Sequence, residues 1–477
     1  MQFYSLEFIG AFVLFFWLFW LLCKTKKTQN IVLLLASYAF YAYLDWRCLI
    51  LLFITSVSTY TAGIFLLTKP SANKRKYDRR WWIVFAAIFF HLLILSYFKY
   101  AGFFVEIIRD LSQRMGGAGT YLSFEIILPV GISFYTFSSI SYIVDCYRRN
   151  IEPTRDAVAC LLYISFFPAI LSGPIHKATQ QLPQYLRTRK FDYNQVVGGF
   201  KDFLWGAFMK LCVADRLGMY VDAVYSNIDS HNGTSFLVSS VFYTLQIYAD
   251  FAGYSLMTIG LGAMLGIKLQ NNFIRPYFSK TITEFWSKWH ISLTSWFKEY
   301  VYIPLGGNRV KKWRWILNIM IVFLLSGLWH GAAYTFIIWG AIHGSTQIIE
   351  KMAYGKKVKN IPTRLCFVNV IRMLLTFSIV SFAWIFFRMP NIQDAVFVIK
   401  NIFTNPGVPF VDMHTLFFAG LSLALLIVKD TTDEYFPEIK LLYSNKTSIS
   451  FFTCLFLILY ILLIGKLDGS SFIYFQF

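Results

Sequence analysis

The chain has 477 residues, of which 57% are hydrophobic and 14% are charged, and its mean hydropathy is +0.54. A water-soluble protein of this length could not cover its surface with so few charged side chains. Long apolar runs recur from one end of the sequence to the other, and no polar stretch is long enough for a soluble domain. The composition excludes an ordinary soluble enzyme and predicts one membrane-embedded, all-α domain over residues 1–477.

The formal net charge is +19, from 44 Lys and Arg against 25 Asp and Glu. The cations gather in short loops between apolar runs: Lys24–Lys27, Lys69–Arg80, Arg148–Arg149, Arg187–Lys190, Lys311–Arg314 and Lys356–Lys359. Such clusters follow the positive-inside pattern of membrane proteins and attract anionic lipid headgroups. The charge therefore predicts a multi-pass protein in contact with membrane lipid, and we expect no nucleic-acid partner.

Apolar runs that could enter the membrane lie roughly at 8–23, 31–44, 48–67, 81–98, 128–145, 156–172, 198–214, 235–266, 316–347, 367–387, 414–428 and 449–465. The runs 235–266 and 316–347 can each form one span or two short ones, so we expect about 11–13 segments, including re-entrant or interfacial helices. No basic segment precedes the first run and no cleavage site follows it, which predicts an uncleaved span. With the N-terminus outside, the basic clusters of the first third all fall inside, provided that Ala101–Ile108 does not cross.

The stretch Thr281–Val301 predicts an amphipathic helix that lies at the membrane interface. At about 100° per residue, one face carries Trp286, Trp289, Leu293, Trp296, Phe297 and Tyr300. The opposite face carries Glu284, Lys288, Ser295, Lys298 and Glu299. His290 falls at the edge of the aromatic face, where it serves either as a structural hydrogen-bond donor or as a site residue. The following Pro304–Gly307 should end the helix and leave Asn308 and Arg309 in a turn.

A second histidine, His330, follows an uncharged run and should lie deep along a span rather than at its end. An ionisable side chain within a membrane suggests a functional site, although an interhelical hydrogen bond is the alternative. Gly327 and Gly331 flank it, so either another backbone approaches there or space opens beside the ring. His343 would point about 140° away from His330 on an unbroken helix, which predicts a packing role or a supporting role behind the site residues.

Other motifs narrow the chemistry. Asp250, in YADFAGYS, is the best candidate for orienting a histidine through its ring N–H, with an internal ion pair as the alternative. The sequence has no HExxH, GxSxG, P-loop or dinucleotide motif, and its seven cysteines form no CxxC pair. We therefore predict no metal and no bound cofactor.

Six segments of the chain read, in order, LPVGISFYTFSSISYIVDCYR, FFPAILSGPI, GAFMKLCVADRL, YADFAGYSLMTIGLGAMLGIKL, NNFIRPYFSKTITEFWSKWHISLTSWFKEYVYIPLGGNR and SGLWHGAAYTFIIWGAIHG. They resemble the membrane-bound O-acyltransferase family, in its bacterial polysaccharide O-acetyltransferase branch. They span about residues 128–344, while residues 1–127 and 345–477 match only in character. The resemblance implies a helical bundle around a central tunnel or funnel, with a histidine where acyl donor and acceptor meet.

The resemblance also assigns residues. The invariant histidine of the family corresponds to His330 and its second signature histidine to His290. Residues expected to line the tunnel or to support the histidines are Asp250, Tyr254, Trp286, Trp289, Asn308, Arg309 and Trp329. One departure is Leu256, because this branch often has an acidic residue after GYS.

The implied function is acetyl transfer for O-acetylation of a cell-surface or exported polysaccharide at a bacterial cytoplasmic (inner) membrane. The donor would be a cytosolic thioester, either acetyl-CoA or an acyl carrier protein, and a separate periplasmic or extracellular acetyltransferase would be the partner. His330 would act as general base on an acceptor hydroxyl, and His290 would orient the donor or polarise the thioester carbonyl. The alternatives are transfer of D-alanine or another acyl group, a non-catalytic transporter, and a scaffolding subunit.

Overall fold

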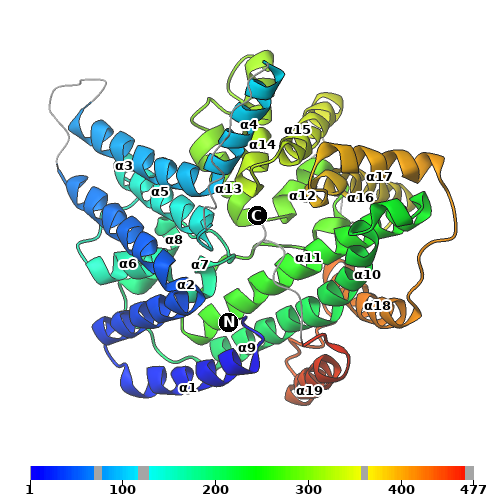
Figure 1. The fold of residues 1–477 in the computed structure, drawn as a ribbon. Coiled ribbons are helices and arrows are strands. Elements are labelled where there is room, and N and C mark those ends of the chain that lie inside the picture. Colours follow the sequence, from blue (N-terminus) through cyan, green and yellow to red (C-terminus); the bar gives the residue numbers. More distant parts are fainter. Residues whose placement is uncertain (1, 69–77, 116–127, 356–363, 468–477) are drawn as a thin grey trace. The chain divides into compact units, whose positions relative to one another are not determined.

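The computed structural model describes residues 2–68, 78–115, 128–355 and 364–467 (Figure 1). Every regular element in these ranges is a helix, which confirms the expected all-α fold. Most of the predicted basic cluster Lys69–Arg80 and all of Lys356–Lys359 lie outside the described residues. The contacts divide the chain into two compact units, Met1–Val196 with Gly262–Gln270 and Val197–Leu261 with Asn271–Phe477. The single domain expected over residues 1–477 stays a prediction.

The helices of the first half are α1 (Leu6–Leu22), α2 (Lys26–Phe65), α3 (Arg79–Leu95), η1 (Ser96–Tyr100), α4 (Ala101–Arg114), α5 (Ile132–Arg148), α6 (Ala157–Ser165), α7 (Phe167–Ile170), α8 (Ala178–Tyr185), α9 (Tyr193–Phe208), η2 (Met209–Ala214), α10 (Asp215–Tyr225) and η3 (Ile228–Ser230). The second half comprises α11 (Gly233–Met264), η4 (Pro276–Phe278), α12 (Ile282–Lys288), α13 (Ile291–Phe297), η5 (Lys298–Tyr302), α14 (Lys312–His330), α15 (Tyr334–Tyr354), α16 (Phe367–Arg388), α17 (Ile392–Thr404), α18 (Met413–Tyr435) and α19 (Thr447–Ile464).

Six helical segments in the described part of the chain are long and apolar enough to cross a membrane. They are Lys26–Phe65, Arg79–Gln113, Lys312–His330, Phe367–Arg388, Met413–Tyr435 and Thr447–Ile464. Large apolar side chains such as Leu463 on α19, which is 81% exposed, face outward on these helices and suit contact with lipid. The chain is therefore a multi-pass membrane protein.

Three of the predicted runs can be compared with helices directly. The runs 31–44 and 48–67 are the two arms of α2, which breaks at Asp45, where φ is −159° and ψ is 107°. The carboxylate of Asp45 accepts a hydrogen bond from the backbone N–H of Arg47 at 2.9 Å, which stabilises the break. The run 235–266 forms one helix, α11, rather than two.

In the first unit, α2 packs against both α5 and α6. Buried polar side chains on α2 meet backbone groups of the 185–189 segment: Asn30 Nδ2 donates to the Tyr185 carbonyl at 2.7 Å. Gln29 donates to the Arg189 carbonyl and accepts from its N–H, both at 2.9 Å. These pairs satisfy buried polar groups that would otherwise destabilise an apolar core.

In the second unit, α14 and α15 form an antiparallel pair joined by three extended or bent residues at 331–333. A Cβ atom at Gly327 would overlap the carbonyl oxygen of Phe336, and one at Gly340 would overlap that of Phe323. At Gly344 it would lie 2.9 Å from Met320 Sδ. The predicted run 316–347 is therefore two helices, and glycine is required wherever their backbones approach most closely.

We predict that Gly340→Ala destabilises the protein by about 1–3 kcal/mol, because the added methyl overpacks the α14–α15 contact. The matched control is Gly420→Ala on α18, where a Cβ atom meets nothing within 4 Å. That change should leave stability unchanged or raise it by up to about 1 kcal/mol, since alanine favours helix. Thermal unfolding in detergent micelles compares the two, and equal melting temperatures would contradict the predicted close contact.

Candidate functional site

The segment that carries His290 is broken rather than continuous. α12 ends at Lys288 and α13 begins at Ile291, and between them His290 adopts φ 44° and ψ 54°. This left-handed conformation costs about 1–3 kcal/mol for a residue with a side chain, and strain of this kind is common at functional sites. The single helix expected over 281–301 was therefore wrong, because its backbone turns at His290.

The tryptophans of this segment face the interior of the protein. Trp286, Trp289 and Trp296 are all buried. His290 itself has 0% of its surface exposed. The break at His290 therefore turns the segment's aromatic face into part of the protein core.

Asn272 determines which nitrogen of His290 carries the proton. Its Oδ1 accepts hydrogen bonds from the backbone N–H of Ser292 at 3.1 Å and from Ser292 Oγ at 2.9 Å. The same oxygen lies 3.2 Å from His290 Nδ1. Because the backbone N–H of Ser292 can only donate, Oδ1 is an acceptor and Nδ1 of the neutral ring carries the hydrogen. The lone pair is left on Nε2, which has no hydrogen-bond partner among the described residues.

His330 is the last residue of α14, so the expectation that it lies along a span rather than at its end was wrong. It is nevertheless only 2% exposed, because α15 folds back over it. Its ring lies against Trp329, Trp339 and Phe387, with centroid distances of 4.9, 5.0 and 5.2 Å. A Cβ atom at Gly331 would overlap the ring of Phe336, so this glycine serves close packing and opens no space.

Two tryptophans connect three histidines into one aromatic cluster. Trp329 lies 5.8 Å from His290 and 4.9 Å from His330, measured between ring centroids. Trp339 lies 5.0 Å from His330 and 5.0 Å from His343. The structure therefore brings the two predicted histidines together and adds a third. On an unbroken helix His343 would point away from His330, but the chain breaks between α14 and α15 and the two residues lie on separate helices.

The sequence model of the membrane-bound O-acyltransferase family matches residues 153–389. A probable alginate O-acetylase of Pseudomonas syringae pv. tomato is 36% identical over 436 residues, which cover 91% of this chain and 82% of the relative. A peptidoglycan O-acetyltransferase of Helicobacter pylori is 30% identical over 525 residues, covering 100% and 95%. A teichoic acid D-alanyltransferase of Bacillus subtilis is 29% identical over 277 residues, covering 55% and 69%.

The chain belongs to the membrane-bound O-acyltransferase family. It is accordingly an O-acyltransferase, and the resemblance inferred from its motifs is confirmed. The matched range contains all three histidines of the cluster as well as Asn272 and both connecting tryptophans. The described cluster is therefore the candidate active site of this O-acyltransferase.

The structure places the remaining predicted site residues of this O-acyltransferase in three surroundings. Trp286 and Trp289 join the aromatic cluster, with Trp286 5.0 Å from His343 and Trp289 5.3 Å from Trp384. Tyr254 is buried on α11. Asn308 and Arg309 lie in an exposed turn after η5, as predicted. That turn is held by Asn318 of α14, whose Nδ2 donates to the Gly307 carbonyl at 3.1 Å.

Asp250 takes part in a buried ion-pair group. Lys210 Nζ lies 2.6 Å from Asp250 Oδ1 and 2.8 Å from Asp215 Oδ1, and all three side chains are at most 2% exposed. This arrangement matches the ion-pair alternative weighed from the sequence. Nδ1 of His290 lies instead beside Asn272, a residue that sequence reasoning missed although it lies in the NNFIRPYFS motif.

Two glutamates anchor the segment that carries His290. Glu350 of α15 accepts from the backbone N–H groups of Ile282 and Thr283, both at 2.8 Å, and so caps α12. Glu434 of α18 binds Lys288 Nζ at 3.0 Å and Arg275 Nε at 2.7 Å. These contacts hold both ends of α12, the helix that leads into the strained turn at His290.

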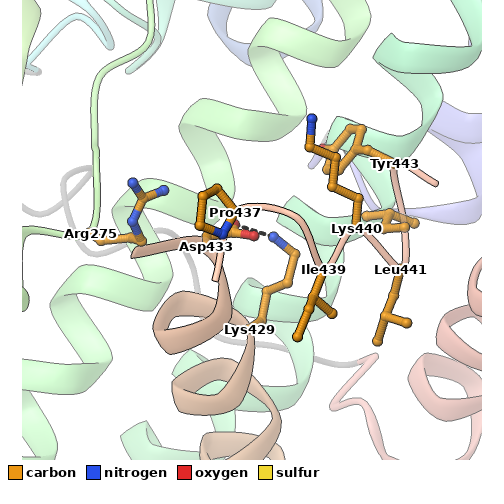
Figure 2. A pocket seen from close by; sticks show the side chains of 9 residues that line it. Arg275, Lys429, Asp433, Pro437, Ile439, Lys440, Leu441 and Tyr443 are labelled. Atoms are coloured by element: carbon orange, nitrogen blue, oxygen red, sulfur yellow. Dashed lines mark hydrogen bonds and ion pairs between the residues drawn. The ribbon is translucent and has the colours of Figure 1, made fainter. Parts of the chain in front are cut away.

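Beside Glu434, Figure 2 shows a surface pocket of about 310 Å³ at the end of α18. Its lining residues are Arg275, Lys429, Asp433, Pro437, Ile439, Lys440, Leu441, Leu442 and Tyr443. Lys429 is paired with Asp433, whereas Lys440 makes no ion pair with any described residue. The cations could hold an anionic group of a substrate. No group of three or more potential metal ligands occurs in the part of the chain that the structure describes.

His290 should make stability depend on pH. Its segment lies outside the six candidate spans, and burial lowers the pKa of its ring from 6.5 to about 3. Between these two values the unfolded chain binds a proton that the folded protein does not bind. The stabilisation is therefore complete above pH 6.5 and is lost as the pH falls toward 3.

We predict that His290→Gln loses about 2–3 kcal/mol less stability than the wild type when the pH is lowered from about 7.5 to 4.5. The glutamine cannot take up a proton in this range, so the share of the acid sensitivity that belongs to His290 disappears. Unfolding in detergent micelles at the two pH values gives the difference. Equal losses in both proteins would show that His290 is not held neutral by burial.

Proposed function

We propose that this protein transfers an acetyl group from a cytosolic thioester for the O-acetylation of a cell-surface or exported polysaccharide. The observation that supports this most strongly is the pair His290 and His330. Both are buried, and both contact the same tryptophan, Trp329. The relatives that cover nearly all of this chain are named for acetylation of alginate and peptidoglycan. The D-alanyltransferase relative covers 55% of it, which favours acetyl over D-alanyl transfer.

In the proposed step, His330 Nε2 removes the proton from an acceptor hydroxyl while the hydroxyl oxygen attacks the thioester carbonyl. The new carbon–oxygen bond forms, the carbon–sulfur bond breaks, and His330 returns the proton to the departing thiolate. A neutral ring is needed at the start, because only its free lone pair can take up the proton. Enclosure of donor and acceptor at one place supplies further rate.

His290 would assist as a hydrogen-bond acceptor. With Nδ1–H directed at Asn272, Nε2 holds a lone pair and can accept a hydrogen bond but cannot donate one to a carbonyl. Of the two roles considered for His290, orientation of a substrate group therefore fits this tautomer better than polarisation of the thioester. An N–H or O–H of donor or acceptor is the complementary partner.

The depth of the site supports a separate partner enzyme. His290 is 0% and His330 2% exposed, so a polymer strand has no access to either ring. We propose that a small acceptor group carries the acetyl away and that a periplasmic or extracellular acetyltransferase places it on the polymer. The positive-inside pattern predicts that the N-terminus lies outside a bacterial cytoplasmic membrane, and the donor would then bind from the cytosolic side.

The donor side is proposed from the distribution of basic residues. Lys311, Lys312 and Arg314 begin α14, and Lys351 lies near the end of the antiparallel α15, so these cations share one end of the pair. Glu350, which caps α12, belongs to the same end. The positive-inside rule makes this end cytosolic. The basic pocket of Figure 2, connected to α12 through Glu434 and Lys288, would bind phosphate groups of a coenzyme A thioester.

We predict that His330→Ala lowers cell-surface ester acetate by at least about 100-fold, because general-base catalysis contributes about 10²–10⁴ to such rates. Acetate released by mild alkali from whole cells measures the effect, with membrane abundance and melting temperature of the variant as controls. If a folded, abundant variant keeps acetate near the wild-type level, His330 is a structural residue and not the general base.

We predict that Lys440→Glu raises the KM for acetyl-CoA about 3- to 10-fold in the reconstituted protein. The substitution reverses the charge of a pocket lysine that makes no ion pair with any described residue. An acetyl thioester of pantetheine, which has no phosphate, should keep its KM. The matched control is Lys446→Glu, which changes an exposed lysine of the same loop outside the pocket lining. If the KM values of both donors are unchanged in Lys440→Glu, the pocket does not bind the donor.

A further inference from the structure

His343 is a buried histidine whose ring nitrogens have no partner. It is 0% exposed, and neither Nδ1 nor Nε2 makes a hydrogen bond to any described residue. Its ring lies against two tryptophans, with centroids 5.0 Å from Trp286 and 5.0 Å from Trp339, and these two rings are 5.7 Å from each other. The N–H groups of these two tryptophans are also buried without a partner in the described residues. Four unpaired polar atoms thus lie within one aromatic cluster.

A cluster of buried polar atoms without hydrogen-bond partners lowers the stability of a protein unless another interaction offsets the desolvation cost. Buried polar groups are nearly always hydrogen-bonded in folded proteins, and each unpaired one carries a desolvation cost. Leucine or phenylalanine at 343 would avoid that cost in a core this apolar. A histidine held here therefore indicates that the position serves a purpose other than packing.

The chemistry of the four atoms specifies a partner. A neutral imidazole supplies one N–H donor and one acceptor, and the two indoles supply one donor each, so donors outnumber acceptors by three to one. A carbonyl oxygen, which has two lone pairs and no hydrogen, complements this set. The three rings carry no charge when His343 is neutral, so an anionic ligand would be buried without compensation.

We propose that Trp286, Trp339 and His343 form a binding site for the carbonyl oxygen of the acyl group, next to His330. Trp339 contacts both histidines, so a carbonyl held by this trio lies beside the base that activates the acceptor hydroxyl. When the hydroxyl attacks, that oxygen gains negative charge, and N–H donors bind it more strongly than they bind the ground-state carbonyl. This inference rests on the proposed acyl transfer and names the residues that bind the carbonyl oxygen in that reaction.

The test compares His343→Leu and His343→Gln in reconstituted protein supplied with acetyl-CoA. His343→Leu should lower kcat about 10- to 100-fold with a KM change below about threefold, since the donors act mainly on the transition state. His343→Gln keeps a donor and should recover at least part of the lost kcat. Trp339→Phe keeps an aromatic ring, loses the N–H, and should lower kcat in the same way. His91→Leu, at a buried histidine of α3, is the matched control and should leave kcat unchanged.

Stability separates this role from a structural one. Because leucine removes unpaired polar atoms, His343→Leu should melt at the same or a higher temperature than the wild type while losing activity. A kcat within threefold of wild type in folded His343→Leu overturns the inference. So does a loss of activity that follows a lowered melting temperature and is not rescued by glutamine. If His330→Ala also retains activity in this assay, the proposed acyl transfer itself fails, which is a distinct result.

Discussion

The backbones of α14 and α15 approach each other closely at Gly327, Gly340 and Gly344, and the candidate site depends on this contact. It reverses the chain immediately after His330 and lays α15 over it, so that the residue at a helix end is buried rather than exposed. It also places Trp339 against His330 and His343. A side chain at these glycines would push the two helices apart and separate the rings.

A second constraint is the strained turn at His290. Its left-handed backbone is held by Glu350 at the start of α12, by Glu434 at the end of it, and by Asn272 at the ring itself. Strain of this size persists only where the surroundings determine it. The result is a neutral imidazole with a defined tautomer in a buried aromatic cluster, which suits the proposed role of His290 as a hydrogen-bond acceptor.

Much of this could be predicted from the sequence, where the signal is local. Apolar runs predict the helices and the membrane, and the break at Asp45 and the turn at Pro304–Arg309 follow from residues within a few positions. The turn at His290 could not be predicted from periodicity, because the contact that stabilises it comes from Asn272, 18 positions earlier. His343 was placed outside the site for a related reason: Trp339, which connects it to His330, follows a helix break that apolar composition conceals.

The most direct test of the account asks whether this chain alone performs the chemistry. Purified protein in proteoliposomes would receive radiolabelled acetyl-CoA or acetylated acyl carrier protein, together with a soluble hydroxyl acceptor. The account predicts labelled acetyl ester on the acceptor and release of thiol in equal amounts, both absent with His330→Ala. Thiol release and ester formation that are equal for wild type and His330→Ala would contradict it, because the buried histidine would then play no part in acyl transfer.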